Sequence, residues 1–429
     1  MIQDTVKRLL YRVKDEQNHT NRVLPSIYMV PGTLRDLSPN SFKPRVVSIG
    51  PLHRGDKNVQ AFEERKATYL FDLIRHTKCA QEVILESCVQ KVYASMEKIK
   101  ASYVWTKTYG DAEIAEMMVM DACFILGFNY QVLLSLEESF YREMLLFKNV
   151  MHDLVLLENQ IPFFILDEIF QCTILKFIPH ASLVKLMYPV LTYLKLFKAD
   201  IKTDHISIDT THHILSLLHQ CYKPQDCIKP SYPRSGIHSA VDLDRAWVNF
   251  KPNQNPTSIW VMEMEVRLSR FQRFFGSWTK PTLTMPILIV GDFTESILRN
   301  LIAYEQSCET RNHITSYASI MNMLVDNQED VSKLVGSGVL VNYMGSNEEA
   351  ASMINNIGKN VTGVHSFYEE QCKTLDKYCN SYWPKNIARL RRTYFNSPWN
   401  MIALLAGIVL FVLTVVQTIF TIKSPGSSK

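Results

Sequence analysis

The segment MIALLAGIVLFVLTVVQTIFTI, residues 401–422, carries no charged side chain. As an α-helix with a rise of 1.5 Å per residue, it would be about 33 Å long, enough to cross a hydrocarbon core of about 30 Å. Tyr394 and Trp399 precede it, where aromatic side chains favour the membrane interface. A core helix is rarely apolar on every side. We therefore predict a transmembrane helix from Met401 to Ile422.

The charges beside this segment predict its orientation. Basic residues are concentrated before it and sparse after it: Lys385, Arg389, Arg391 and Arg392 precede it, and Lys423 and Lys429 follow. The positive-inside bias then places the body of the chain in the cytosol. The start, MIQDTVKRLLYRVKDEQ, has no apolar signal-peptide region. We expect a single-pass protein with a C-terminal anchor, in the plasma membrane or an endomembrane. The small residues Ala403, Ala406 and Gly407 would permit close approach of a second span, so a homo-oligomer is a further hypothesis.

Charge and cysteine usage exclude several classes of protein. The 46 basic and 42 acidic residues leave a net charge of +4, spread along the chain, whereas nucleic-acid binding needs a concentrated basic face. The nine cysteines form no CxxC pair, so we expect reduced thiols rather than a secreted disulfide framework. The sequence has no Walker A loop, GxSxG elbow, HExxH pair or Rossmann glycine fingerprint, and we expect no cofactor.

Apolar residues make up 47% of the chain, and most recur three or four positions apart, as in amphipathic helices. We predict a mainly α fold with minor β elements. Body helices are expected at residues 60–74, 81–100, 111–128, 130–148, 149–170, 181–198 and 210–222, with a helical stalk at 364–395.

Further local signals lie in the second half of the sequence. TLTMPILIV, residues 282–290, is typical of a strand. Asp292 followed by Glu295 resembles a capping box that starts a helix. Ser346 with Glu349 repeats that signature, and Gly358 would close the second helix as a left-handed C-cap.

Composition also divides the chain into parts. Residues 21–58 are rich in Pro, Gly, Ser and Asn, which indicates an ordered loop with a strand or two. Residues 223–258 combine prolines with polar turns and predict a linker or small β element, in which AVDL and AWVNF are candidate strands. We expect an N-terminal helical lobe at 1–222, this linker, a second helical lobe and stalk at 259–395, and the anchor with a short tail at 396–429.

Three adjacent polar residues, Glu158, Asn159 and Gln160, interrupt the apolar run LLENQIPFFIL. Pro162 lacks an N–H group and disfavours helical geometry at the preceding residue, which leaves carbonyls at 157–158 without donors. Amide side chains at 159 and 160 could cap that break. We therefore favour a structural polar clamp over a catalytic Glu158. The same interpretation applies to Glu305 and Gln306 in the related phrase LIAYEQ.

His53 is the best candidate for a catalytic group. It follows a Gly-Pro turn, and a helical carboxylate, Glu63 or Glu64, could orient it as a general base. The alternative is a loop histidine that pins the turn between Gly50 and Gly55. The sequence offers no nucleophile context for this histidine, which favours the structural alternative.

The segment HHILSLLHQCYKPQDC gathers possible metal ligands at His212, His213, His219, Cys221 and Cys227. Zinc sites use closely spaced ligand pairs that converge on one ion. The two cysteines are too far apart for that pairing, and His212 and His219 are separated by two helical turns. We therefore expect no metal at this segment.

Several phrases occur together in a fixed order: SIYMVPGTLRDLSPNSFKPRVVSIGPLHRG, FEERKATYL, MMVMDACFIL, DLVLLENQIPFFIL, SAVDLDRAWVNF, NLIAYEQ, LVDNQEDVSKLVGSGVLVN and SPWNMIALLAGIVLFVLTVVQTIF. The set resembles the plant domain-of-unknown-function family 247 and covers nearly the whole chain. The resemblance implies a mostly helical land-plant protein with one C-terminal span. Some grass members of that family look like self-incompatibility determinants. The family pattern has a second histidine where this chain has Arg54, which puts a two-histidine chemistry in doubt.

Together these features favour a membrane-tethered recognition, interaction or scaffold protein with a protein partner. An enzyme is the alternative: a membrane-bound hydrolase or transferase that uses His53 with Glu63 or Glu64.

Overall fold

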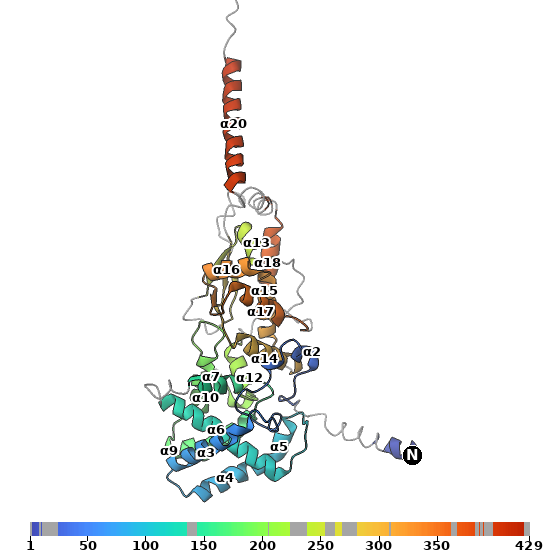
Figure 1. The fold of residues 1–429 in the computed structure, drawn as a ribbon, viewed down its shortest axis with the longest axis vertical. Helices are drawn as coiled ribbons and strands as arrows, with labels where there is room; N and C mark the ends of the chain where they lie inside the picture. Colours follow the sequence, from blue (N-terminus) through green and yellow to red (C-terminus); the bar gives the residue numbers. More distant parts are fainter. Residues whose placement is uncertain are drawn as a thin grey trace, which may run out of the picture.

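The computed structural model describes residues 2–7, 10, 25–134, 144–204, 206–223, 238–253, 262–267, 281–308, 310–361, 367–381, 386, 389 and 398–423. The chain is mainly helical with a few short strands, which confirms the predicted fold class. The body is elongated, with helices α3, α4 and α6 at one end and α20 beyond the other (Figure 1).

The first half of the body is built from helices, most of them short. They are α2 (Gly32–Arg35), α3 (Glu63–His76), α4 (Gln81–Ala94), α5 (Met96–Ala101), α6 (Asp111–Leu134), α7 (Met144–Asp153), α8 (Phe163–Cys172), α9 (Ile174–Phe177), α10 (Leu183–Leu186), α11 (Tyr188–Tyr193) and α12 (Ile214–Cys221), with 3-10 turns at Pro39–Ser41, Gln60–Phe62 and Ile208–Thr210.

The second half adds strands and further helices. They are α13 (Ala240–Arg245), β1 (Asn249–Pro252), β2 (Glu265–Arg267), β3 (Thr282–Met285), β4 (Leu288–Val290), α14 (Thr294–Ser307), α15 (His313–Leu324), α16 (Gln328–Gly336), β5 (Leu340–Asn342), α17 (Asn347–Ile357), α18 (Glu369–Cys379) and α20 (Pro398–Lys423).

Two helices in the described part of the chain are long and apolar enough to cross a membrane, and their burial separates them. In α6, with a mean hydropathy of 1.5, 67% of the apolar window is buried inside the body, so it is a core helix. In α20, with a mean hydropathy of 2.6, none of the window is buried. The predicted span lies within α20, which stands clear of the body (Figure 1). The chain therefore carries a candidate C-terminal membrane helix.

Helix α6 continues through Gly127, where the sequence analysis expected it to end. A methyl group at Gly127 would lie 3.3 Å from the Tyr69 carbonyl oxygen and 3.4 Å from its Cβ. The glycine therefore lets α3 approach α6 closely. Phe124 and Phe128 pack edge to face against the same tyrosine ring, and this close packing outweighs the low helix propensity of glycine.

The strands form two small sheets. β3 lies between β1, which is parallel to it, and β2, which is antiparallel, and β4 pairs with β5 in parallel. The phrase TLTMPILIV supplies both β3 and β4, as expected of a strand-like segment. AWVNF contributes to β1, but AVDL was wrongly predicted as a strand. It lies in α13, whose first turn is capped by the Ser239 side chain accepting from the Asp242 amide.

Other element boundaries differ from the predictions. Residues 149–170 do not form one helix, because α7 ends at Asp153 and α8 begins at Phe163. Residues 81–100 are divided at Ser95, and 181–198 hold only α10 and α11.

Two helix ends in the second half of the chain also differ from the predictions. Phe293, not Asp292, precedes the first residue of α14, so the expected capping box does not form. The Ser346 hydroxyl does cap α17, but Gly358 closes that helix with φ −78°, not in the left-handed region.

Candidate functional site

The turn between α7 and α8 contains the three polar residues of LLENQIPFFIL, and all three are buried. Asn159 donates to the carbonyls of Val47 and Asp153, and Gln160 donates to those of Leu154 and Leu156, at distances from 2.8 to 3.0 Å. These carbonyls differ from those at 157–158 that the sequence analysis named, because the whole segment is a turn and not a broken helix. The two amides therefore hold this turn together from within.

Glu158, like Asn159, also contacts the loop at residues 25–58. Its carboxylate accepts from the Val30 amide at 2.8 Å and pairs with the guanidinium of Arg35. The second carboxylate oxygen lies 3.0 Å from Nε2 of His53. The Glu158 side chain is fully buried, and an unpaired carboxylate there would be costly. Its three partners make the burial tolerable.

His53 lies between two carboxylates, but they are not the predicted ones. Its Nε2 faces Glu158, and its Nδ1 lies 2.8 Å from Asp56. Burial lowers the pKa of His53, but the hydrogen bonds that the ring donates to Glu158 and Asp56, together with their negative charges, outweigh this and raise the pKa overall. Glu63 instead contacts Lys66 at 2.7 Å, and Glu64 is exposed to solvent. The histidine is only 3% exposed, so both ring nitrogens are occupied inside the protein.

A second buried ion pair, which the sequence analysis did not single out, lies beneath the same loop. Nζ of Lys66 lies 2.6 Å from Oδ1 of Asp121 and also donates to the Ser48 carbonyl. The other carboxylate oxygen accepts from the Gly50 amide at 2.8 Å. Burial raises the pKa of Asp121, while Lys66 and the Gly50 amide oppose that rise. The available signal was an acid within the all-apolar phrase MMVMDACFIL.

Further buried polar groups hold the loop along its length. Asp153 accepts from the amides of residues 45–47 at 2.8 to 3.0 Å. On the other side, Ser296 and Asn300 of α14 donate to the Ser41 carbonyl. Tyr28 donates to the Ala303 carbonyl at 2.6 Å. Residues 25–58, the described part of the segment predicted at 21–58, contain α2 and a 3-10 turn in place of the expected strands. Side chains from both halves of the body fix this loop.

Glu305, the counterpart of Glu158 in LIAYEQ, is also buried. It accepts from the amides of Ile314 and Thr315 in the first turn of α15, at 2.9 and 2.7 Å. Nε2 of His219 lies 2.8 Å from its Oε1, and Nδ1 of His313 lies 3.8 Å from the same atom. Gln306 is only half-buried. Glu305 therefore caps α15, and two imidazoles lie beside its Oε1.

The remaining residues of the histidine-rich segment have separate roles. His213 caps α12 by accepting from the Ser216 amide. Nδ1 of His212 lies 2.9 Å from the Tyr304 hydroxyl. Burial raises the pKa of the Cys221 thiol to about 12, which leaves it protonated and unreactive. Cys227 lies outside the described residues.

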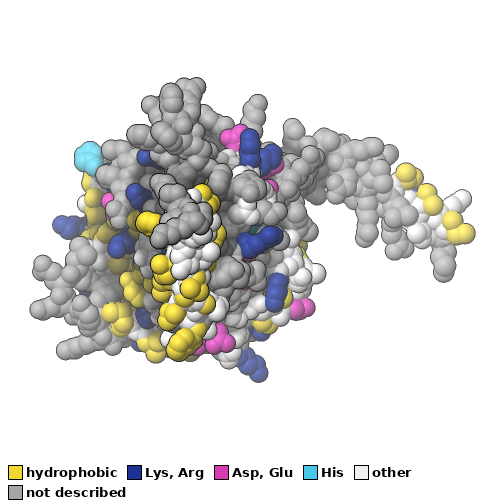
Figure 2. Space-filling view, turned by 90° about the horizontal axis from the view of Figure 1, so that it is seen from above, with side chains coloured by type: hydrophobic (Ala, Val, Ile, Leu, Met, Phe, Trp, Pro, Cys, Tyr) yellow, Lys and Arg dark blue, Asp and Glu magenta, His cyan; other side chains and the backbone are white. Residues whose placement is uncertain are grey.

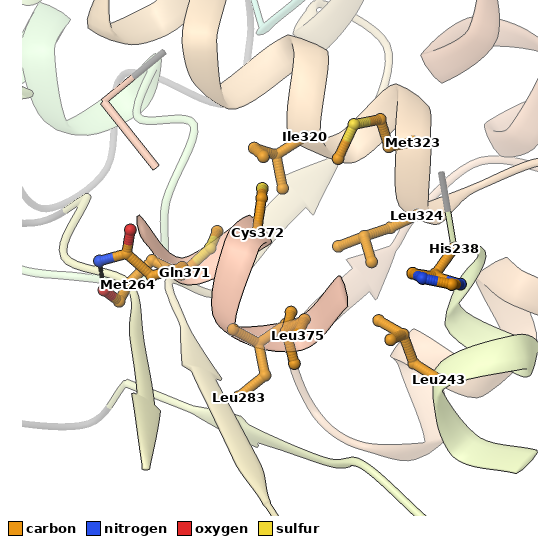
Figure 3. Close-up of a pocket in the computed structure, with 10 residues that line it drawn as sticks. All are labelled: His238, Leu243, Met264, Leu283, Ile320, Met323, Leu324, Gln371, Cys372 and Leu375. Carbon is orange, nitrogen blue, oxygen red and sulfur yellow. Dashed lines mark hydrogen bonds between the residues drawn. The ribbon is translucent and has the colours of Figure 1, made fainter. Parts of the chain in front are cut away.

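A largely apolar pocket lies away from these polar residues, toward the α20 end of the body. It encloses about 380 Å³ of space not filled by atoms, including its open mouth. Side chains from α13, α15 and α18 and from the β2–β3 sheet point into it (Figure 3). His238 and Gln371 supply polar groups in the lining, and Gln371 donates to the Met264 carbonyl. None of the predicted catalytic candidates lines this pocket.

These residues form a network of buried hydrogen bonds between acidic side chains and the loop backbone. Glu158, Asp121 and Asp153 are all fully buried, and each accepts hydrogen bonds from the backbone of loop 25–58. Oriented carboxylates of this kind hold backbone amides in place. The arrangement fixes the position of a surface loop.

Comparisons with known proteins show which family the chain belongs to. The family profile DUF247, described as plant protein of unknown function, matches residues 27–413. UPF0481 protein At3g47200 of Arabidopsis thaliana is 27% identical over 424 residues, covering 93% of this chain and 86% of that protein. Putative UPF0481 protein At3g02645 of the same plant is 32% identical over 184 residues, covering 42% of this chain and 32% of that protein. No solved structure matches the chain.

Proposed function

Because the chain belongs to the DUF247 family of plant proteins, whose function is unknown, we propose a function from its geometry. It is a membrane-anchored recognition protein that holds a rigid loop, residues 31–45, in the cytosol for a protein partner. The observation that carries this proposal is that buried acids hold the backbone at both ends of this loop, at Val30 and at residues 45–47.

The rigidity of the loop supports recognition. Binding loops are effective when a scaffold holds them in one conformation, because less conformational entropy is lost on association. Here the loop carries exposed polar residues, among them Thr33, Asp36, Asn40 and Lys43. It leads through α2, which lies on the outside of the body near α14 (Figure 1). A partner could therefore contact it without any rearrangement of the core.

Helix α20 supports the membrane anchor. Its apolar side chains are exposed on all sides, and a large exposed apolar surface needs a lipid or protein cover. Figure 2, seen from the α20 end, shows hydrophobic side chains gathered near the middle of this face, with basic and acidic side chains scattered singly around it. The basic residues before the span favour the cytosol as the side of the body.

We further propose that the helical lobes at 1–222 and 259–395 act as one scaffold, joined by the segment at 223–258. The loop supports this because it is bonded to both halves, through Glu158 in the first and Asn300 in the second. A movement between the halves would break these bonds. With the halves held together in this way, the scaffold would present the loop at a fixed distance from the membrane.

The test is proximity labelling in plant cells with a labelling enzyme at the N-terminus. We expect the full chain to label a stable partner that a double variant in the loop, D36K/K43E, no longer labels. The matched control reverses two exposed charges on α4, E82K/K91E, and should label the partner normally. A chain truncated after Asn396 should lose the membrane and the partner together. If the loop variant labels the same proteins as the control, loop recognition is wrong.

The competing enzyme hypothesis rests on His53, which the structure pairs with Glu158 and Asp56 and not with Glu63 or Glu64. Two carboxylates beside one imidazole could tune a general base. His53 is buried and both of its ring nitrogens contact carboxylates, so a substrate would have no access to the ring. If a hydrolase or transferase activity were found and H53N abolished it at unchanged thermal stability, the enzyme hypothesis would replace recognition.

A further inference from the structure

Three metal-ligating side chains meet in the middle of the body, and none of them has a part in the loop network. They are His219 of α12, Glu305 of α14 and His313 of α15. Their ligand atoms all lie within 4.8 Å of one another, and all three residues are buried. The ring centroids of the two histidines are 4.2 Å apart. Three helices thus direct two imidazoles and one carboxylate to the same point.

One of these ligand atoms has no partner. Nδ1 of His313 is buried and makes no hydrogen bond, although the residue is only 1% exposed. Its other ring nitrogen, Nε2, lies 3.3 Å from the His219 carbonyl. When Nε2–H donates to that carbonyl, Nδ1 carries a lone pair that faces the Glu305 carboxylate. A buried lone pair without a donor is costly, and a cation between Nδ1 and the carboxylate would satisfy it.

We propose that His219, Glu305 and His313 bind one zinc ion. Two imidazole nitrogens and one carboxylate oxygen form a ligand set that zinc accepts, with a fourth position for water. Ligand atoms about 2.1 Å from a tetrahedral zinc lie about 3.4 Å apart. Here the separations from Oε1 of Glu305 are 2.8 Å to His219 and 3.8 Å to His313. Small side-chain rotations bring all three to the ion.

The surrounding hydrogen bonds fit this role. Metal-bound histidines commonly donate their second ring nitrogen to a carbonyl, which orients the first nitrogen. His313 has this arrangement with the His219 carbonyl. Glu305 can keep the Thr315 hydroxyl and amide on Oε2 and the Ile314 amide on Oε1, while a second lone pair of Oε1 binds zinc. His219 would bind zinc through Nε2 as the neutral tautomer that carries its proton on Nδ1.

Burial, and after it the positive charges of His219 and Arg311, disfavour a positive charge at His313. The Glu305 carboxylate opposes these effects. Because the ligands are buried and come from α12, α14 and α15, the ion would join helices of both halves of the body. Its role would be structural, and it is independent of partner recognition by the loop.

The experiment uses the full chain in detergent, passed over a chelating resin and then titrated with Zn²⁺ or Co²⁺ alone. We expect about one equivalent of metal bound per chain and the visible absorption of tetrahedral Co²⁺. The variant H313Q should bind zinc at least about 100-fold more weakly, since even residues that only orient a ligand contribute 10–100-fold. In a metal-free buffer H313Q should melt no lower than H152Q, because each variant replaces a buried histidine that is hydrogen-bonded through Nε2.

The matched control is H152Q, which changes a fully buried histidine that contacts Ser296 and lies outside the site. It should bind zinc as the wild type does. Wild-type affinity in H313Q would overturn the proposal, because the metal would then sit on other histidines. Absence of stoichiometric metal in the wild type, or equal loss in both variants, would overturn it as well.

Discussion

Replacing Lys66 with methionine tests whether the charges beneath loop 25–58 are compensated as the structure indicates. The lysine and aspartate side chains of this pair are 1% and 0% exposed, so solvent does not screen them. After the substitution, Asp121 keeps only the Gly50 amide among the partners described, and the Ser48 carbonyl loses its donor. Breaking a buried pair from one side typically costs about 3–5 kcal/mol.

Protonation of Asp121 sets an upper limit to this penalty. One pKa unit corresponds to 1.36 kcal/mol, so keeping a carboxyl with an ordinary pKa of about 3.9 neutral at pH 7 costs about 4 kcal/mol. The unpaired Ser48 carbonyl adds about 1 kcal/mol. At pH 5 the protonation cost falls to about 1.5 kcal/mol. The loss of stability in K66M should therefore shrink on acidification from about 5 to about 2.5 kcal/mol.

Substituting the acid should cost about as much as substituting the base. In D121N the amide oxygen can still accept from Gly50, but the NH₂ group then faces the Lys66 ammonium, which is another donor. We expect a loss of about 3–5 kcal/mol.

Urea unfolding of the full chain in detergent at pH 7 and pH 5 would measure these differences. The control is K57M, which changes an exposed lysine and should stay within about 0.5 kcal/mol of the wild type. A K66M loss no larger than that of K57M, or one that grows at pH 5, would refute the reasoning.

Three further outcomes follow from the structure. The raised pKa of His53 contributes stability that is fully present below the unfolded value of about 6.5 and is lost as pH rises through the folded value; unfolding curves should show this decline in the wild type and much less of it in E158Q. Gly50 has φ +71°, and a methyl group there would lie 2.5 Å from the Gln160 carbonyl oxygen; G50A should lower the melting temperature by several degrees, and an unchanged value would show that the loop adjusts freely. In α20, V412R should cost about 2.5–3.5 kcal/mol of insertion free energy and move protein to the carbonate-soluble fraction. If V412R were distributed between the fractions like the unmodified chain, that result would count against a span.

The sequence predicted those features that depend on neighbouring residues. The uncharged run at 401–422 is visible without any tertiary contact, and so are the buried helix around MMVMDACFIL and the Ser346 cap. Helix limits were less well predicted where packing decides them. The low helix propensity of Gly127 predicts the end of a helix, but the close contact with Tyr69 keeps this glycine inside α6. AVDL reads as a strand from its apolar residues, but the Ser239 cap starts a helix.

The site could be predicted only in part, because its contacts join residues far apart in the chain. His53 was identified, but its partner Glu158 lies more than a hundred positions away. Its other partner, Asp56, is only three positions away and was passed over for the helical acids Glu63 and Glu64. The ligands around Glu305 pose the same difficulty. His219 was considered with its neighbours in HHILSLLHQC, whereas the structure pairs it with residues of α14 and α15.

The two phrases LLENQ and LIAYEQ show what the chain does with its buried acids. Glu158 lies in a turn and Glu305 in a helix, yet each accepts from backbone amides of another segment: Val30 for the first, Ile314 and Thr315 for the second. An acid used in this way fixes one part of the fold onto another. Substitutions at either glutamate should then act on partner binding only through stability, whereas loop substitutions should act on binding at constant stability. The difference between these two effects separates scaffold from recognition surface.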